Sequence, residues 1–220
     1  MWPSLGDVRT RVRRRLNEAT AAFWTDEQLD RMIKAGILDV AAKTLCIENK
    51  DSATTTPSSR SVAYTGFKVN FVEYVPPSGA PVGLPRILPH QLGRLPFGGT
   101  QPQYWCPWGS AVLIDPVPAA AHSLNLYVAD YPDLSVTGDS ETLDGSFGLP
   151  LETHELVADY ATIHALLKDR KFATAGRLYA DFTNNVMKAR IMFMQRRADT
   201  RADIVIPDRL EVQRQSRREE

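Results

Sequence analysis

Residues 25–44, TDEQLDRMIKAGILDVAAKT, carry a helix start and a helix-packing face in one segment. Thr25 followed by Gln28 is a capping box, in which each side chain bonds a backbone N–H group that the helix leaves free. An apolar stripe at helical spacing follows, formed by Leu29, Ile33, Gly36, Ile37, Val40 and Thr44. Glycine is unfavourable inside a helix, so Gly36 predicts a close crossing with a second helix at this point.

Further helices are expected on both sides of this one. Ser4 with Asp7 has the form of a capping box and begins a first helix. A third helix is expected to begin at residues 151–153, and a fourth follows after a short corner. The fourth carries a heptad-like run of Ala175, Tyr179, Phe182, Val186, Ala189 and Phe193. Residues 1–48 and 150–197 are therefore expected to form a helical bundle, in which the last two helices pair as a hairpin.

The middle of the chain, residues 49–149, is expected to be a β-rich insertion. Its first part, residues 49–61, is polar and predicts a loop. Aromatic and β-branched residues favour strands at 62–75, 111–115 and 124–128. Eight prolines in residues 76–109 exclude a helix or a central strand and predict an ordered loop, anchored by Phe97, Tyr104, Trp105 and Trp108. The fold class is therefore α+β, with residues 198–220 as an extended C-terminal arm.

Charge is distributed unevenly along the chain, although the 220 residues have no formal net charge. Residues 69–160 hold ten acidic residues against Arg86 and Arg94, whereas residues 161–218 hold thirteen basic residues against six acidic ones. This segregation favours contacts between copies of the chain or with a partner. It is not the pattern of a protein that coats DNA, which is basic throughout its binding face.

The cysteines and the N-terminal sequence indicate the cellular compartment in which the protein is made. Cys46 and Cys106 lie 60 residues apart, with no metal-ligand spacing, so we expect two free thiols in a reducing compartment. The N-terminal residues lack the apolar run of a signal peptide, and no stretch approaches the length of a membrane span. We therefore expect a protein made in the cytoplasm, with no membrane partner.

No catalytic motif is complete. His154-Glu155 begins the HExxH pattern of zinc proteases, but Ala158 stands where the second histidine would be. An acidic loop containing Asp139, Glu141 and Asp144 would either bind a divalent cation or remain solvated. We therefore expect no enzyme, no cofactor and no metal, and a small metal-dependent hydrolase is kept as an alternative.

The arginines at positions 9–15 are most simply explained as a solvated helix face, because runs of charge usually have that role. The alternatives are contacts with another subunit or a partner, and phosphate binding. Guanidinium groups form bidentate pairs with carboxylates, which would suit contacts with the acidic middle of another subunit. The candidates for such contacts are Arg9, Arg13, Arg14, Glu155 and Asp159. Phosphate binding would make the protein a DNA-binding regulator, the second alternative. Tyr104, Trp105 and Trp108 lack the interleaved cations needed for base stacking and are expected to pack in a core or an interface.

The C-terminal arm contains one β-like sequence, Asp203-Ile204-Val205-Ile206-Pro207, among mixed charges. Such a segment can add a strand to the sheet of a partner, through backbone hydrogen bonds and side-chain pockets. It can also fold back on the β insertion of its own chain. The sequence favours neither arrangement over the other.

Three parts of the chain together resemble the head-to-tail adaptor (connector) proteins of tailed bacteriophages. They are WTDEQL at 24–29 with IKAGI at 33–37, LP at 149–150 with HELVADYA at 154–161, and AGRLY at 175–179. The similarity covers most of the chain as an order of elements. These segments are helix-packing sequences and carry no chemistry.

The resemblance implies a structural protein of the virion neck that is made in the host cytoplasm. Copies would form a ring, usually of twelve, beneath the portal protein. The ring would extend the DNA channel, without sequence-specific DNA binding, and would offer a platform for tail or nozzle proteins. The arm would dock on the portal through Asp203, Ile204, Val205, Ile206, Pro207 and Arg209.

Overall fold

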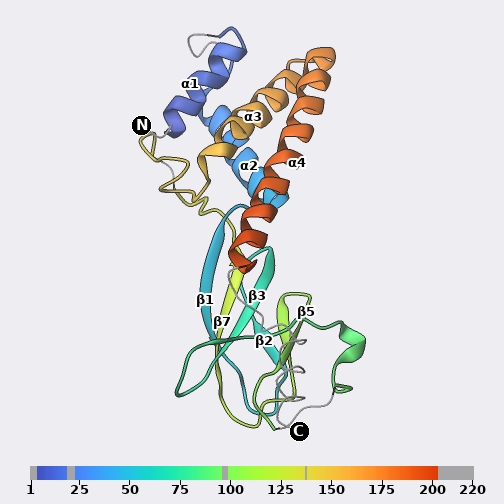
Figure 1. The fold of residues 1–220 in the computed structure, drawn as a ribbon. Helices are drawn as coiled ribbons and strands as arrows, with labels where there is room; N and C mark the ends of the chain where they lie inside the picture. Colours follow the sequence, from blue (N-terminus) through green and yellow to red (C-terminus); the bar gives the residue numbers. More distant parts are fainter. Residues whose placement is uncertain (1–3, 19–22, 96–98, 137, 203–220) are drawn as a thin grey trace.

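The computed structural model describes residues 4–18, 23–95, 99–136 and 138–202, and it consists of a helical unit and a β unit (Figure 1). The helices are α1 (Leu5–Arg15), α2 (Asp26–Thr44), α3 (His154–Lys168) and α4 (Phe172–Ala202), and the 3-10 turn η2 (Leu151–Thr153) precedes α3. The strands lie between α2 and α3 in the sequence. The α+β architecture expected from the sequence is confirmed.

The predicted helix starts are confirmed at α1 and α2. At α1 the backbone N–H of Asp7 donates to Ser4 Oγ at 3.2 Å, and the backbone N–H of Ser4 donates to the Asp7 carboxylate at 2.9 Å. At α2 the backbone N–H of Gln28 donates to Thr25 Oγ1 at 3.2 Å. Each box satisfies donors that the first helical turn leaves free, so local sequence sets where both helices begin.

The helical core forms where α2 packs against α3 and both pack against α4. Gly36 lies at the α2–α3 contact, where a Cβ atom would be 3.0 Å from Cδ1 of Tyr160 and 3.2 Å from its Cβ. The predicted close crossing is therefore confirmed. Leu143, Phe147 and Leu149 also belong to this core, so the end of the segment expected in the β insertion packs against the helices.

The β unit contains two antiparallel sheets. One has the order β1-β7-β3-β4, formed by β1 (Glu48–Thr54), β7 (Ser123–Ala129), β3 (Lys68–Val75) and β4 (Val82–Gly83). The other has the order β2-β6-β5, formed by β2 (Ser61–Ala63), β6 (Ala111–Asp115) and β5 (Tyr104–Trp108). The sheets share a second hydrophobic core that includes Val72, Ile114 and Leu126. Trp105 lies in this core and donates its indole N–H to the Leu84 carbonyl at 3.0 Å.

The prediction of a loop at residues 49–61 is wrong for its first part, which belongs to the edge strand β1. All seven residues of β1 pair with β7, although their side chains are mostly exposed. The strand predicted at 62–75 is two strands in different sheets. Gly66 separates them with a φ of 130°, and a Cβ atom there would lie 2.7 Å from the Ala129 carbonyl oxygen.

The proline-rich segment 76–109 contains structure that the loop prediction missed. It forms β4, the 3-10 turn η1 (Pro89–Gln91) and β5. The exclusion of a central strand is confirmed, because β4 and β5 both lie at sheet edges, where proline is tolerated. Trp105 is buried, Trp108 is exposed, and Phe97 lies outside the described residues.

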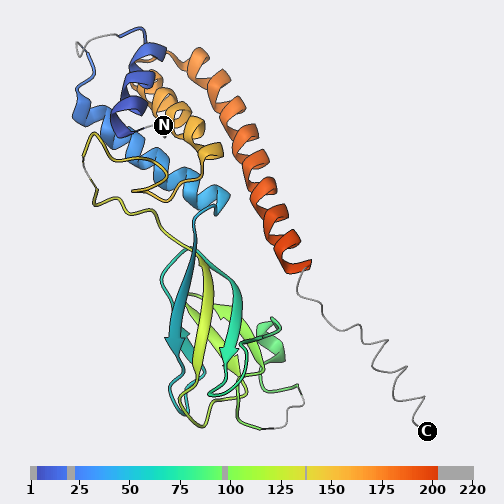
Figure 2. The ribbon, with the colours of Figure 1, turned by 60° about the vertical axis from the view of Figure 1, so that its left-hand side comes forward.

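The last helix is longer than predicted. α4 continues to Ala202, so residues 198–202 of the expected arm are helical. In two views, α4 lies on one outer side of the helical unit and runs toward the β unit (Figures 1 and 2). The rest of the expected arm, residues 203–220, lies outside the described residues.

Candidate assembly surfaces

Two buried arginines of α1, Arg9 and Arg13, form ion pairs with other segments of the helical unit. Arg9 is buried and donates to Asp30 on α2 at 2.7 and 2.8 Å and to Asp139 at 2.7 Å. Hydrogen bonding to Arg9 lowers the pKa of the Asp139 carboxyl. Arg13 is also buried and donates to the Trp24 carbonyl at 2.8 Å and to Asp26 at 2.6 Å. Both guanidinium groups are therefore engaged within the subunit.

The other candidates for contacts between subunits lie at the α1–α3 junction. Arg15 donates to Asp159 at 2.6 Å and to Glu155 at 3.0 Å, and Arg11 also pairs with Glu155. Burial raises the pKa of Asp159, against the lowering effect of Arg15. Arg14 is exposed and makes no ion pair with a described residue, so it is the α1 candidate with a guanidinium group available to a partner.

The residues of the incomplete catalytic motifs have structural contacts. His154 is buried, and its Nε2 lies 2.8 Å from the Leu149 carbonyl oxygen. In the acidic loop, Asp139 is bound by Arg9, and Glu141 accepts a hydrogen bond from the Ser146 hydroxyl at 2.5 Å. No group of three His, Cys, Asp or Glu side chains among the described residues is placed to hold a metal ion. The arrangement supports packing of the loop against α1.

The two cysteines are buried thiols, neither of which is in a disulfide. Burial raises the pKa of Cys106, which keeps its thiol protonated at neutral pH. The prediction that Cys46 and Cys106 do not form a disulfide is thus confirmed.

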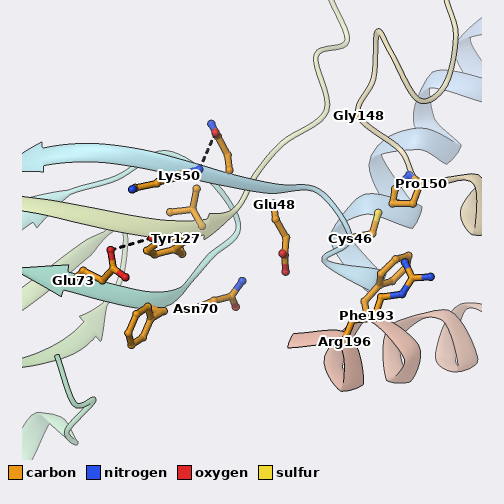
Figure 3. Close-up of a pocket in the computed structure, with 13 residues that line it drawn as sticks. Cys46, Glu48, Lys50, Asn70, Glu73, Tyr127, Gly148, Pro150, Phe193 and Arg196 are labelled. Carbon is orange, nitrogen blue, oxygen red and sulfur yellow. Dashed lines mark hydrogen bonds between the residues drawn. The ribbon is translucent and has the colours of Figure 1, made fainter. Parts of the chain in front are cut away.

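A groove of about 780 Å³ lies between the end of α4 and the larger sheet (Figure 3). Phe193 and Arg196 of α4 line one side, and Lys50, Glu73 and Tyr127 line the sheet side. The Tyr127 hydroxyl donates to Glu73 at 2.9 Å, and burial raises the pKa of this tyrosine. Apolar rings among a few charged groups are the usual lining of a ligand pocket.

This groove could not be predicted from the sequence, because its lining comes from five separate segments of the chain. Phe193 belonged to the predicted apolar stripe of the fourth helix, but nothing in the spacing placed it beside a sheet. The predicted portal-binding residues Asp203, Ile204, Val205, Ile206, Pro207 and Arg209 lie outside the described residues.

Comparisons with known proteins complete these observations. A search among curated proteins finds no match. Within the described residues, no helix combines the length and the apolar character needed to cross a membrane. The family model of the SU10 adaptor protein matches residues 3–208, which include the helical unit, the β unit and the first residues of the expected arm. The chain therefore belongs to the SU10 adaptor protein family, a family of phage head-tail adaptors.

Proposed function

We propose that this protein is a structural, non-enzymatic part of the phage neck, which assembles as a ring beneath the portal and joins the head to the tail. The observation that carries the proposal is the family match over residues 3–208, because it spans both units and not one shared motif. The ring, of twelve copies in our proposal, extends the DNA channel and offers its far side to tail or nozzle proteins.

The C-terminal arm is proposed to attach the ring to the portal. The arm follows α4, a helix of 31 residues whose core face is fixed in the bundle. A rigid helix gives the arm a defined starting point, and an apolar segment then adds to a sheet of the portal through backbone hydrogen bonds. Ile204, Val205 and Ile206 supply the side chains for that contact, with Asp203, Pro207 and Arg209 beside them.

The surface that contacts neighbouring subunits is proposed to include Arg14, Glu155 and Asp159. Arg14 and Glu155 are exposed and line the same surface pocket, and Asp159, one helical turn after Glu155 on α3, is half-buried. Arg9 and Arg13 contribute indirectly, because they fix the α1 backbone from which Arg14 extends.

The test is co-sedimentation of the full chain with the purified portal ring of the same phage, with stoichiometry read from the mass of the complex. Saturable binding at about one copy per portal subunit is the expected result for matched rings. Absence of binding to an intact portal ring would overturn the proposal.

Two variants locate the contact in the arm. A chain that ends at Ala202 keeps all described helices and is expected to fold but not to bind the portal. Ile204→Asp is expected to weaken binding, because the carboxylate must lose its water in a β-addition site. Ile204→Val keeps the apolar surface and serves as the control. Unchanged binding by both the truncated chain and the aspartate variant would place the contact outside the arm.

A further inference from the structure

α4 has two apolar faces, and only one of them is used within the subunit. Its core face buries Ala175, Phe182, Val186, Ala189 and Phe193. The opposite face carries Met187, Ile191 and Met194, which are 58%, 51% and 55% exposed. Their spacing of four and three residues places them on one line along the helix. A line of large exposed apolar side chains is typical of an interaction surface.

Basic residues flank this line, which we call the outer face of α4. Arg177, Lys188 and Arg190 are exposed, against a single exposed acid, Asp181, in the described part of the helix. A partner for the outer face therefore needs apolar contacts with an acidic surround.

The segment 130–144 has that character. It holds five acidic residues and no lysine or arginine. Asp139 is occupied by Arg9, but Asp133 and Asp144 are exposed. Tyr131 is 49% exposed and lies against Phe67 with ring centroids 4.2 Å apart, which provides a supported aromatic surface. Methionine side chains pack favourably against such rings.

The two surfaces lie on opposite sides of the subunit. Figures 1 and 2 both place the described parts of this segment, residues 130–136 and 138–144, on the side of the helical unit that faces away from α4. The outer face of α4 and the segment 130–144 therefore cannot meet within one subunit. They can meet between two copies that follow one another in the same orientation. Contacts of this head-to-tail kind generate a ring when the rotation between copies closes.

We propose that the outer face of α4 in one copy docks on the segment 130–144 of the next copy. The inference rests on the proposed function for the existence of a ring, and it adds which two surfaces form the contact. Each subunit then contacts one neighbour through the outer face of α4 and the other neighbour through the segment 130–144. Every copy in a closed ring therefore uses both surfaces.

A photo-crosslinking amino acid at Ile191 tests the contact directly. Heavy-isotope and unlabelled full-length chains are mixed, illuminated both free at raised concentration and bound to the portal ring, and mapped by mass spectrometry. Crosslinks between heavy and light copies that end in residues 130–144 are expected. Crosslinks to α4 of another copy, to the portal alone, or only within one copy would overturn the inference, and so would their absence in both states.

A control site for the crosslinker tests its specificity, and a charge reversal tests the charge complementarity. The same crosslinker at Leu88, 55% exposed on the β unit, is expected to give no crosslink to residues 130–144. Arg177→Glu with Lys188→Glu is expected to abolish the Ile191 crosslink. Adding Asp133→Lys and Asp144→Lys to that chain is expected to restore it, and failure to restore it would refute the charge complementarity.

The portal experiment separates the two proposals. Loss of portal binding with intact crosslinks between copies overturns the adaptor function and keeps the contact. Portal binding without crosslinks to residues 130–144 does the reverse.

Discussion

Replacing Gly36 by alanine sets two effects of known size against each other. Alanine in a helix interior is more favourable than glycine by about 1 kcal/mol. The added methyl group, however, would lie 3.0 Å from Cδ1 and 3.2 Å from Cβ of Tyr160, closer than an ordinary carbon contact of about 3.5–4.0 Å. The sign of the change therefore depends on whether Tyr160 can move.

The packing around Tyr160 restricts such movement. Its ring lies 4.2 Å from the ring of His164 and 5.9 Å from the ring of Phe182, measured between centroids. Phe182 is itself fully buried in the helical core. Overpacking of this kind costs about 1–3 kcal/mol. Gly36→Ala is therefore expected to lower the free energy of unfolding by up to about 2 kcal/mol, after the gain in helix propensity is subtracted.

The assay is urea unfolding followed by helical circular dichroism, in two backgrounds. In a Tyr160→Ala chain the closest contact is gone, so the cost of Gly36→Ala is expected to fall by about 1 kcal/mol or more. Gly176→Ala on α4 is the matched control, because a Cβ atom there meets no atom within 4 Å. It is expected to stabilise the chain by about 1 kcal/mol. An equal cost of Gly36→Ala in both backgrounds would refute the role of Tyr160.

Three further measurements test other parts of the structure. Arg9 lowers the pKa of Asp139, so this pair stabilises the fold above the unfolded carboxyl pKa and loses its effect as the pH falls through the lower folded value. Asp139→Asn is therefore expected to destabilise the chain at pH 6, with a difference in unfolding midpoint that disappears in strong acid; a constant difference would contradict the ion pair. Thr25→Ala should cost about 1 kcal/mol through loss of the α2 cap, whereas Thr25→Ser should cost little, and equal losses would contradict capping. Trp105→Ala should cost about 3–5 kcal/mol by emptying the β core, and a loss below 1 kcal/mol in thermal unfolding would refute its placement there.

The elements that could be predicted are those whose cause lies within a few residues. Thr25 and Gln28 form their capping box within one turn of α2, and the position of Gly36 in an apolar stripe was enough to predict a close helix crossing. β1 could not be predicted in the same way. Its sequence, ENKDSAT, has no apolar alternation, because the strand lies at an edge with both faces largely exposed. Its seven-residue pairing with β7, far away in the sequence, makes it a strand.

The candidate surfaces show the same division between local and distant causes. Charge counts along the chain predicted complementary contacts between copies or with a partner, and they did not predict the ion pairs that form within the subunit. The structure assigns Arg9 and Arg13 to contacts within the subunit, since Asp30, Asp139 and Asp26 surround them. Those contacts need α1, α2 and a loop more than a hundred residues away to be placed together, which spacing in the sequence does not encode.

The consequence is that the charges available for assembly are fewer than the sequence suggests. Once Arg9 and Arg13 are paired internally, the exposed basic residues that remain on the helical unit include three on α4, beside Met187, Ile191 and Met194. They are Arg177, Lys188 and Arg190. A surface that combines apolar area with unpaired charge can gain from desolvation and from charge complementarity at once. The outer face of α4 has both features, which is the reason for proposing it as the surface that meets a neighbouring copy.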